Sequence, residues 1–352
     1  MSGWPDRCFL DLVGSEQPIV QAPMANGGGV ELCVAALRGG AVGSLPGGMV
    51  APDELRAQVG AVRERAQGPI NLNFFCHRPP PAVDDSAWRA LLKPYYEQFS
   101  IESAAPGPAR MPFGEAACAV VEEVRPALVS FHFGLPEQAL LDRVKAAGTV
   151  VVASATSVEE ALWLERAGVD AVIAQGIEAG GHSGRFLGAD PAEAMTLFAL
   201  LPQVVDAVAV PVIAAGGIGD GRGIAAAFLL GASAAQIGTA YLHCPESLLA
   251  PEQRHMLKER PTLFTNLYSG GLARAVRGRL VDELGAVRSE APSYPLAGAA
   301  AMPLWRAAQQ QRDFGFMPSL AGQSAPLGQA LPAADLTRKL AEDALALLGR
   351  PA

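Results

Sequence analysis

The sequence lacks several features that would place it in other classes of protein. Its basic residues are scattered over a chain of net charge −8, so no basic face is available to bind the phosphates of nucleic acid. Asp6 and Arg7 interrupt the segment where a signal peptide would need an apolar run. The cysteines form no CxxC pair and no zinc-ligand spacing with histidine, which indicates reduced thiols in a cytosolic protein: Cys8, Cys33, Cys76, Cys118 and Cys244. We therefore expect a cytoplasmic protein that does not act on nucleic acid.

One stretch without charged residues, 224–242, has the length of a membrane span. Glycines and polar residues interrupt it, and it divides into a helical segment (IAAAFLLG) and a strand-like segment (AAQIGTAYL). It predicts a buried helix followed by a buried strand instead of a membrane helix.

Short apolar runs recur along the chain, and a helical pattern follows most of them. Because the runs are continuously apolar instead of alternating, they predict strands that are covered on both faces, as in a parallel sheet. The runs are PIVQAPMA (18–25), GAVGSLPGG (40–48), PINLNFF (69–75), ALVSFHFG (127–134), TVVVASATS (149–157), AVIAQGIEAGG (171–181), PVIAAGGI (211–218) and AAQIGTAYL (234–242).

Eight strands that alternate with helices predict an α/β protein with a (β/α)8 TIM barrel. The alternative is a doubly wound sheet, whose dinucleotide-binding form carries GxGxxG after an early strand. No such motif follows the first strands here, which favours the barrel. Within it, Ser157 followed by Glu160 is a capping-box pattern that marks the start of an amphipathic helix.

Two parts of the chain fall outside the eight units. Residues 76–113, rich in proline and aromatic residues, form an insertion after the third strand of a barrel that spans residues 1–242. Residues 243–352 form a mostly helical C-terminal extension, which we expect to cover the barrel mouth as a second lobe.

The loops after the seventh and eighth strands read AAGGIGDGRG and QIGTAYL, at the place where TIM barrels often bind phosphate. Gly216 and Gly217 allow a ligand to approach the backbone closely, and the helix after them offers free N–H groups and the positive end of its dipole. Gly238 and Thr239 add further N–H donors and a hydroxyl. Tight packing at helix starts would explain single glycines, whereas two such loops at these strand ends favour a phosphate.

The stretch AQGIEAGGHSG ends the sixth strand beside this phosphate site. Gln175 can donate and accept hydrogen bonds at a planar heterocycle, and Gly180 and Gly181 clear space for one. Asn73, at the end of the third strand, is another amide at the barrel mouth. Flavin mononucleotide (FMN), with one phosphate and a ring that has hydrogen-bonding edges, suits this set of residues.

Other interpretations of the same stretch have less support or stay open. A plain turn that happens to carry His182 is compatible with the local sequence, because glycine mainly reports a strained or closely approached backbone. Glu178 and His182 have no third residue nearby to complete a metal site. No GxSxG elbow is present to support a Ser/His/Asp triad.

Several segments together resemble the nitronate monooxygenase family, formerly called 2-nitropropane dioxygenases, and particularly its class I members. They are PIVQAPMA, VSFHFGLP, VVASATSVEEA, AQGIEAGGHSG, PVIAAGGIGDGRG, QIGTAYL, YSGGLARAVRGRLVDE and LAGQSAPL. The resemblance implies an FMN-dependent enzyme that oxidises alkyl nitronates or propionate 3-nitronate with O2 to a carbonyl compound and nitrite, without NAD(P)H.

The resemblance also implies roles for individual residues. His182 takes the position of the family's catalytic histidine. A cationic His182 would offset the negative charge of a nitronate, and a neutral one would remove a proton from a nitroalkane. PINLNFF differs from the sequence that is commoner in the family for this strand. The choice of Asn73 over Asn71 as the cofactor contact therefore rests on the register of the strand. The FMN contacts fall on Met24, Asn73, Gln175, Gly180, Gly217, Gln236, Ile237, Gly238 and Thr239.

Further alternatives concern the pocket and the reaction. His132 either lines the pocket or is a satisfied core residue, and Tyr294 in the extension either closes the pocket or simply packs. Two alternative functions are also compatible with the sequence: an NAD(P)H-dependent flavin reductase acting on quinones or enoyl thioesters, and a non-catalytic flavoprotein that senses or stores FMN.

Overall fold

The fold is known from a computed structural model that describes residues 3–81, 83–102, 110–188 and 191–349. Eight parallel strands form one sheet in the order β1-β9-β8-β6-β5-β4-β3-β2. A parallel bridge between Val20 and Val42 joins the two edges of this sheet and brings it close to full closure. The predicted (β/α)8 barrel is therefore confirmed.

All eight predicted strands are present, and each is shorter than the apolar run that predicted it. They are β1 (Ile19–Gln21), β2 (Gly43–Leu45), β3 (Ile70–Phe75), β4 (Leu128–His132), β5 (Val150–Ala155), β6 (Ala171–Gln175), β8 (Val212–Ala215) and β9 (Ala234–Ile237). The ends of the runs continue as loops or turn into other elements. Thr239, expected in the last strand, begins the short helix α10 (Thr239–Leu242) instead.

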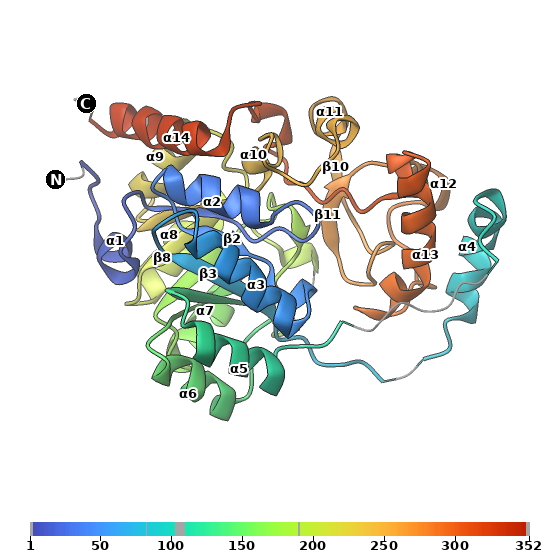
Figure 1. Cartoon of the computed structure of the whole chain (residues 1–352), viewed down its shortest axis with the longest axis horizontal. Helices are drawn as coiled ribbons and strands as arrows, with labels where there is room; N and C mark the ends of the chain where they lie inside the picture. The colour runs from blue at the N-terminus through green and yellow to red at the C-terminus, as the bar shows by residue number, and fades with distance from the viewer. Residues whose placement is uncertain (1–2, 82, 103–109, 189–190, 350–352) are drawn as a thin grey trace.

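Eight helices surround the barrel. They are α2 (Val30–Arg38), α3 (Pro52–Arg63), α5 (Glu115–Val124), α6 (Gln138–Ala146), α7 (Val158–Arg166), α8 (Leu197–Ala207), α9 (Gly221–Leu229) and α14 (Ala333–Leu348). The last of these follows the whole extension in the chain, yet it packs against α9 and α2 at the side of the barrel (Figure 1). Ser157 caps α7 as predicted, because its hydroxyl accepts a hydrogen bond from the Glu160 N–H at 3.2 Å.

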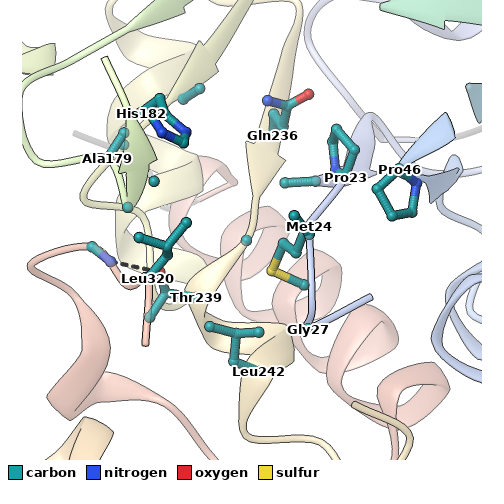
Figure 2. A pocket seen from close by; sticks show the side chains of 18 of the residues that line it. Pro23, Met24, Gly27, Pro46, Ala179, His182, Gln236, Thr239, Leu242 and Leu320 are labelled. Atoms are coloured by element: carbon teal, nitrogen blue, oxygen red, sulfur yellow. Dashed lines mark hydrogen bonds between the residues drawn. The ribbon is translucent and has the colours of Figure 1, made fainter. Parts of the chain in front are cut away.

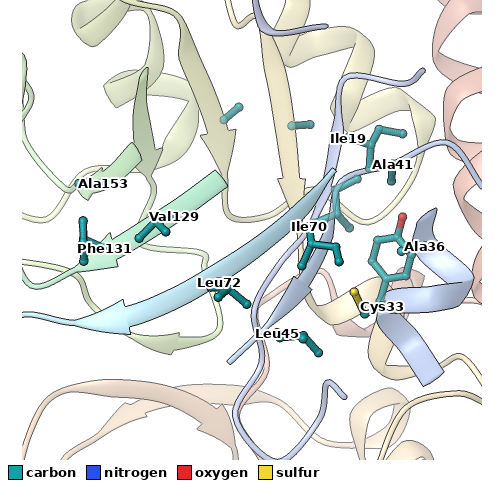
Figure 3. Packing of buried hydrophobic residues seen from close by; sticks show 14 of the residues in the cluster. Ile19, Cys33, Ala36, Ala41, Leu45, Ile70, Leu72, Val129, Phe131 and Ala153 are labelled. Carbon is teal, nitrogen blue, oxygen red and sulfur yellow. The ribbon is translucent and has the colours of Figure 1, made fainter. Parts of the chain in front are cut away.

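The barrel strands contribute to two apolar layers. Their inward side chains, such as Val20 and Ile213, form one cluster with Phe9 and Val13 of α1 (Cys8–Val13), a helix that lies outside the ring of eight. Their outward side chains pack against the ring of helices, as Figure 3 shows for strand residues near α2. Strands covered on both faces need mainly apolar residues on each face, which explains why the runs in the sequence are largely apolar and do not alternate.

A second lobe lies beside the barrel (Figure 1). It contains α4 (Ser86–Gln98) from the insertion and, from the extension, α11 (Pro251–Glu259), β10 (Thr262–Thr265), β11 (Ala273–Val276), α12 (Arg279–Leu284) and α13 (Leu296–Gln310). The indole of Trp88 donates a hydrogen bond to the Ala297 carbonyl at 3.1 Å, and both residues belong to one hydrophobic cluster. The insertion and the extension therefore share a core, while the domain boundary at residue 242 stays a prediction.

A three-stranded antiparallel sheet in the order β10-β11-β7 connects this lobe to the barrel, and the sequence did not reveal it. The strand β7 is Gly181–His182, and His182 pairs with Ala273 of β11. Four short 3-10 helices complete the described structure: η1 (Gly47–Met49), η2 (Pro191–Glu193), η3 (Phe314–Phe316) and η4 (Ala325–Leu327).

Two smaller expectations are also answered. The uncharged stretch 224–242 is the end of α9, all of β9 and α10, and none of the described helices is both long and apolar enough to span a membrane. All five cysteines are free thiols.

Candidate active site

A cavity of about 190 Å³ opens at the carboxyl ends of the barrel strands. Figure 2 shows His182 and Ala179 on one side of it and Pro23, Met24 and Pro46 on the other. Most of the predicted site residues line it: Met24, Asn73, His132, Gln175, Gly180, Gly181, His182, Gly217, Gln236, Gly238 and Thr239. Two predicted site residues do not line the cavity. Ile237 is 1% exposed and belongs to the hydrophobic core, and Tyr294 packs against the ring of His182 without reaching the cavity surface.

Four backbone N–H groups at the ends of β8 and β9 form a candidate anion site. The N–H groups of Gly217, Ile218, Gly238 and Thr239 have no hydrogen-bond acceptor among the residues that the structure describes, and all four residues line the cavity. Gly217 has a φ of 70°, a backbone conformation that favours glycine. Clustered unpaired N–H donors suit the oxygens of a single phosphate group.

The helix after the first of these loops offers fewer free donors than the sequence predicts. Asp220 is the N-cap of α9, and its Oδ1 accepts hydrogen bonds from the N–H groups of Arg222 and Gly223 at 3.0 and 3.4 Å. The carboxylate therefore occupies these two donors, and its negative charge offsets the positive end of the helix dipole. At the helix start the Gly221 N–H has no acceptor among the described residues, so this N–H and the loop backbone are left to bind an anion here.

Thr239 also holds a distant segment of the chain beside the candidate anion site. Its Oγ1 accepts a hydrogen bond from the N–H of Gly322 at 2.9 Å, drawn as a dashed line in Figure 2. Leu320, Gly322 and Ser324 of this segment line the cavity. The LAGQSAPL stretch thus forms part of the site, although no single residue in it was predicted to do so.

The two adjacent glycines of the AQGIEAGGHSG loop, Gly180 and Gly181, have different roles. A side chain at Gly180 would collide with the backbone of Ala321 and Gly322, so this glycine makes room for the chain and not for a ligand ring. Gly181 has a φ of 80°, and a Cβ atom there would meet no protein atom within 4 Å. The free space predicted beside both glycines is therefore found only at Gly181.

At the site, some hydrogen-bonding groups of the amide side chains are occupied by protein, and others are free to bind a ligand. Asn73 donates to the carbonyl and hydroxyl of Ser130, both at 3.0 Å, and lines the cavity, whereas Asn71 is completely buried and donates to Ser44. The Asn73 side-chain oxygen and the Gln236 amide have no hydrogen-bond partner among the described residues. These amide groups of the cavity therefore have free hydrogen-bonding capacity.

Gln175 is largely occupied by the loop that carries His182. Its Nε2 donates to the His182 carbonyl at 3.0 Å, and its Oε1 accepts from the Gly184 N–H at 2.7 Å. The amide therefore bridges the loop on both sides of Ser183 and fixes the backbone of His182 relative to β6.

His132 supports the same carbonyl from another strand. Its Nε2 lies 3.1 Å from the His182 carbonyl oxygen, which can only accept, so Nε2 carries the proton and Nδ1 accepts from the Ser154 hydroxyl at 3.2 Å. Burial lowers the pKa of His132 to about 4, so the ring is neutral near pH 7. Both interpretations of His132 hold in part, because it lines the cavity and is also hydrogen-bonded at both nitrogens.

His182 has one ring nitrogen engaged and one available. Its Nε2 lies 2.8 Å from the Ser269 hydroxyl oxygen, while Nδ1 has no hydrogen-bond partner among the described residues. Burial, followed by the positive charge of Arg110, lowers the pKa of His182 to about 3. Of the two protonation states considered from the sequence, the neutral one is therefore present at neutral pH.

Aromatic rings surround His182 on its outer side. The ring centroid of Tyr294 lies 5.0 Å from that of His182, and Phe75 and Phe133 make edge contacts with the same imidazole. These rings exclude water from the histidine, which is the physical cause of its lowered pKa.

Sequence reasoning missed two polar residues that position the site. Ser269, the partner of His182, lies in the YSGG stretch that was noted only for its resemblance. Glu160, expected to complete a helix cap, is completely buried, and its Oε1 accepts hydrogen bonds from the N–H groups of Phe186 and Leu187 beyond the His182 loop. Neither partner lies near in sequence, so local patterns carried no signal of them.

The family model described as "Nitronate monooxygenase" matches residues 8–343. The chain belongs to the nitronate monooxygenase family. It is 41% identical to a nitronate monooxygenase from Paraburkholderia phytofirmans over 95% of this chain and 94% of that one. A second nitronate monooxygenase, from Pseudomonas aeruginosa, is 39% identical over 95% of this chain and 98% of its own length.

A solved structure gives the same result at the level of the fold. The nitroalkane oxidase from Streptomyces ansochromogenes superposes with a TM-score of 0.89 and 35% identity, over 96% of this chain and 98% of that one. The nitronate monooxygenase family membership predicted from the sequence is thus confirmed, and the chain is an oxidoreductase.

Proposed function

We propose that this protein binds FMN in the cavity and oxidises alkyl nitronates or propionate 3-nitronate with O2, giving a carbonyl compound and nitrite without NAD(P)H. The family membership supports the reaction class. FMN, when bound, would supply the redox chemistry by accepting an electron from the nitronate. The residues of the protein would bind the cofactor and the substrate, orient them and control proton transfer.

The residues fit this cofactor at both of its ends. The unpaired N–H groups of Gly217, Ile218, Gly238 and Thr239 match one phosphate, which favours FMN over a dinucleotide. The open side-chain oxygen of Asn73 and the Gln236 amide match the hydrogen-bonding edge of a flavin ring, and Met24 covers the opposite wall of the cavity.

The observation that carries the choice of substrate is a neutral His182 whose Nδ1 is unengaged. A pKa of about 3 makes this imidazole a weak base, since efficient proton abstraction needs a pKa near the working pH. A nitronate has already lost its proton and needs no strong base, whereas a neutral nitroalkane does. The site therefore suits preformed nitronates better than nitroalkanes.

The test combines cofactor analysis with two assays on the purified protein. Released cofactor should be FMN by chromatography, and FAD would contradict the proposal. Oxygen consumption and nitrite release with propyl-1-nitronate and propionate 3-nitronate, measured without NADPH, should both be observed.

The same preparation separates the proposal from its alternatives. Rapid anaerobic bleaching of the flavin by NADPH, together with no nitrite from any nitronate, would replace the monooxygenase with a flavin reductase. Bound FMN with neither activity would indicate a non-catalytic flavoprotein.

A further inference from the structure

The hydroxyl of Ser269 is the one hydrogen-bond partner of the His182 imidazole among the residues that the structure describes. Its oxygen lies 2.8 Å from His182 Nε2. Ser269 is 6% exposed, so neighbouring protein groups and not bulk water determine where its single proton points. The position of that proton decides which ring nitrogen of the neutral His182 carries a hydrogen.

Gly271 offers the Ser269 hydroxyl both a donor and an acceptor. The Gly271 N–H donates to Ser269 Oγ at 3.4 Å, and the Ser269 hydroxyl can donate to the Gly271 carbonyl oxygen, also at 3.4 Å. Both bonds are longer than the contact with His182. Neither backbone group of Gly271 has another hydrogen-bond partner in the described part of the chain, so both depend on Ser269.

Two arrangements of the protons are compatible with these contacts. In the first, His182 Nε2 carries the hydrogen and donates to Ser269, and the Ser269 hydroxyl donates to the Gly271 carbonyl. In the second, the hydroxyl donates to Nε2, so the hydrogen moves to Nδ1 and the Gly271 carbonyl is left without a donor. Only the first arrangement pairs every polar group that meets at Ser269. Because polar groups shielded from water are normally hydrogen-bonded, the first arrangement is favoured.

The backbone of His182 is held in place by groups other than Ser269. Its carbonyl accepts hydrogen bonds from Gln175 Nε2 and His132 Nε2 at 3.0 and 3.1 Å, and His182 pairs with Ala273 in the small antiparallel sheet. The imidazole itself is otherwise only packed against aromatic rings, which do not distinguish its two nitrogens. The hydrogen bond to Ser269 is therefore the interaction that sets the tautomer of the ring.

We propose that Ser269 is a positioning residue that keeps the hydrogen of the neutral His182 ring on Nε2 and leaves Nδ1 as the proton acceptor. The inference rests on the proposed function and concerns its slower branch, the use of neutral nitroalkanes. When Nδ1 takes the proton from the carbon that bears the nitro group, the nitroalkane becomes its nitronate and the imidazole becomes an imidazolium. The Nε2–H of that imidazolium still donates to Ser269, so no hydrogen bond of the cluster is lost during the transfer.

The kinetic experiment compares Ser269→Ala, Ser269→Thr and the wild type on nitroethane and on ethyl nitronate, with the FMN content of each preparation measured. Ser269→Ala should lower kcat/KM for nitroethane on the order of tenfold to a hundredfold, mainly through kcat, because Nδ1 is no longer held as the acceptor. Its kcat/KM for ethyl nitronate should change less than about threefold, since no C–H proton is removed. Ser269→Thr keeps a hydroxyl and should recover part of the loss on nitroethane.

Ser319→Ala is the matched control, because Ser319 is another buried serine of the extension, its hydroxyl accepts from Gln253, and it does not line the cavity. It should leave kcat/KM for both substrates unchanged. Equal losses on nitroethane and ethyl nitronate in Ser269→Ala, or the same loss on nitroethane in Ser319→Ala, would overturn the inference.

A spectroscopic measurement keeps this result separate from the reaction itself. In holoenzyme labelled with ¹⁵N in its histidine rings, NMR at neutral pH should show the hydrogen of His182 on Nε2, and the His182→Asn variant identifies the signals by their loss. The same signals should report a mixture of both tautomers in Ser269→Ala. If the wild type oxidises neither substrate, the proposed function fails, while the spectrum still decides the role of Ser269. A hydrogen on Nδ1 in the wild type, or an unchanged His182 spectrum in Ser269→Ala, would contradict that role.

Discussion

Replacing His182 with Asn tests what a neutral, weakly basic imidazole does in this cavity. Asn keeps a polar side chain of similar reach but accepts no proton near neutral pH. The backbone carbonyl at this position stays held by Gln175 and His132, so the loop should keep its place. FMN content should therefore remain near that of the wild type.

The expected losses differ between the two kinds of substrate. A general base contributes roughly 100-fold to 10,000-fold, so turnover of neutral nitroethane should fall on the order of a hundredfold or more. Oxidation of ethyl nitronate should fall less than about tenfold, because no C–H proton is removed. Even in the wild type the nitroalkane should be the poorer substrate, since a pKa of about 3 instead of 6.5 lowers the driving force for proton transfer by roughly 4–5 kcal/mol.

The pH dependence gives the sharpest check. The basic form of His182 is present above its pKa, so activity that needs this base is lost only as the pH falls toward about 3. Between pH 8 and 5 the kcat/KM for nitroethane should carry no inflection that depends on His182. An inflection near 6.5 that disappears in His182→Asn would refute the argument, as would equal and small losses of this variant on both substrates.

Two further substitutions test groups that hold the site together. Thr239→Val removes the acceptor for the buried Gly322 N–H, so the free energy of unfolding in urea should fall by about 1–3 kcal/mol and FMN affinity should weaken by about 1–2 kcal/mol; an unchanged dissociation constant for FMN would remove Thr239 from the cofactor site. Glu160→Gln places a side-chain N–H donor against backbone N–H groups whose hydrogen bonds the carboxylate accepts in the wild type. The free energy of unfolding in urea should therefore fall by about 1–3 kcal/mol. The exposed neighbour provides the control, and Glu159→Gln should change the unfolding free energy by less than about 0.5 kcal/mol; similar losses in both variants would contradict the role given to Glu160.

The parts of the fold that local chemistry determines were predictable from the sequence. Strands buried on both faces leave continuous apolar runs, and a serine three residues before a glutamate marks a helix start, so the barrel and the cap at Ser157 were both recovered. The Asp220 cap could also have been inferred, because aspartate directly before a helix is a common N-cap. The glycines around Asp220 instead suggest an open helix end.

The remaining features depend on contacts between segments that are far apart in the chain. Gly180 faces residues 321–322, and Ser269 meets a histidine that lies 87 positions earlier. The pairing of β7 with β11 is of the same kind, since a two-residue strand has no periodicity to detect. Such contacts follow from the closed barrel and the lobe together, and no local window of sequence contains them.

The position of α14 has a consequence for how the protein is made. This helix completes the outer ring against α2 and α9, but it is synthesised after every strand of the barrel and after the whole lobe. While the ribosome is still translating the lobe, the apolar surfaces of α2 and α9 that α14 covers are exposed to water. We therefore expect the nascent barrel to be prone to aggregation, and a chain that stops before residue 333 to remain so. The insertion of the second lobe thus delays the docking of the last helix of the barrel until the lobe has been synthesised.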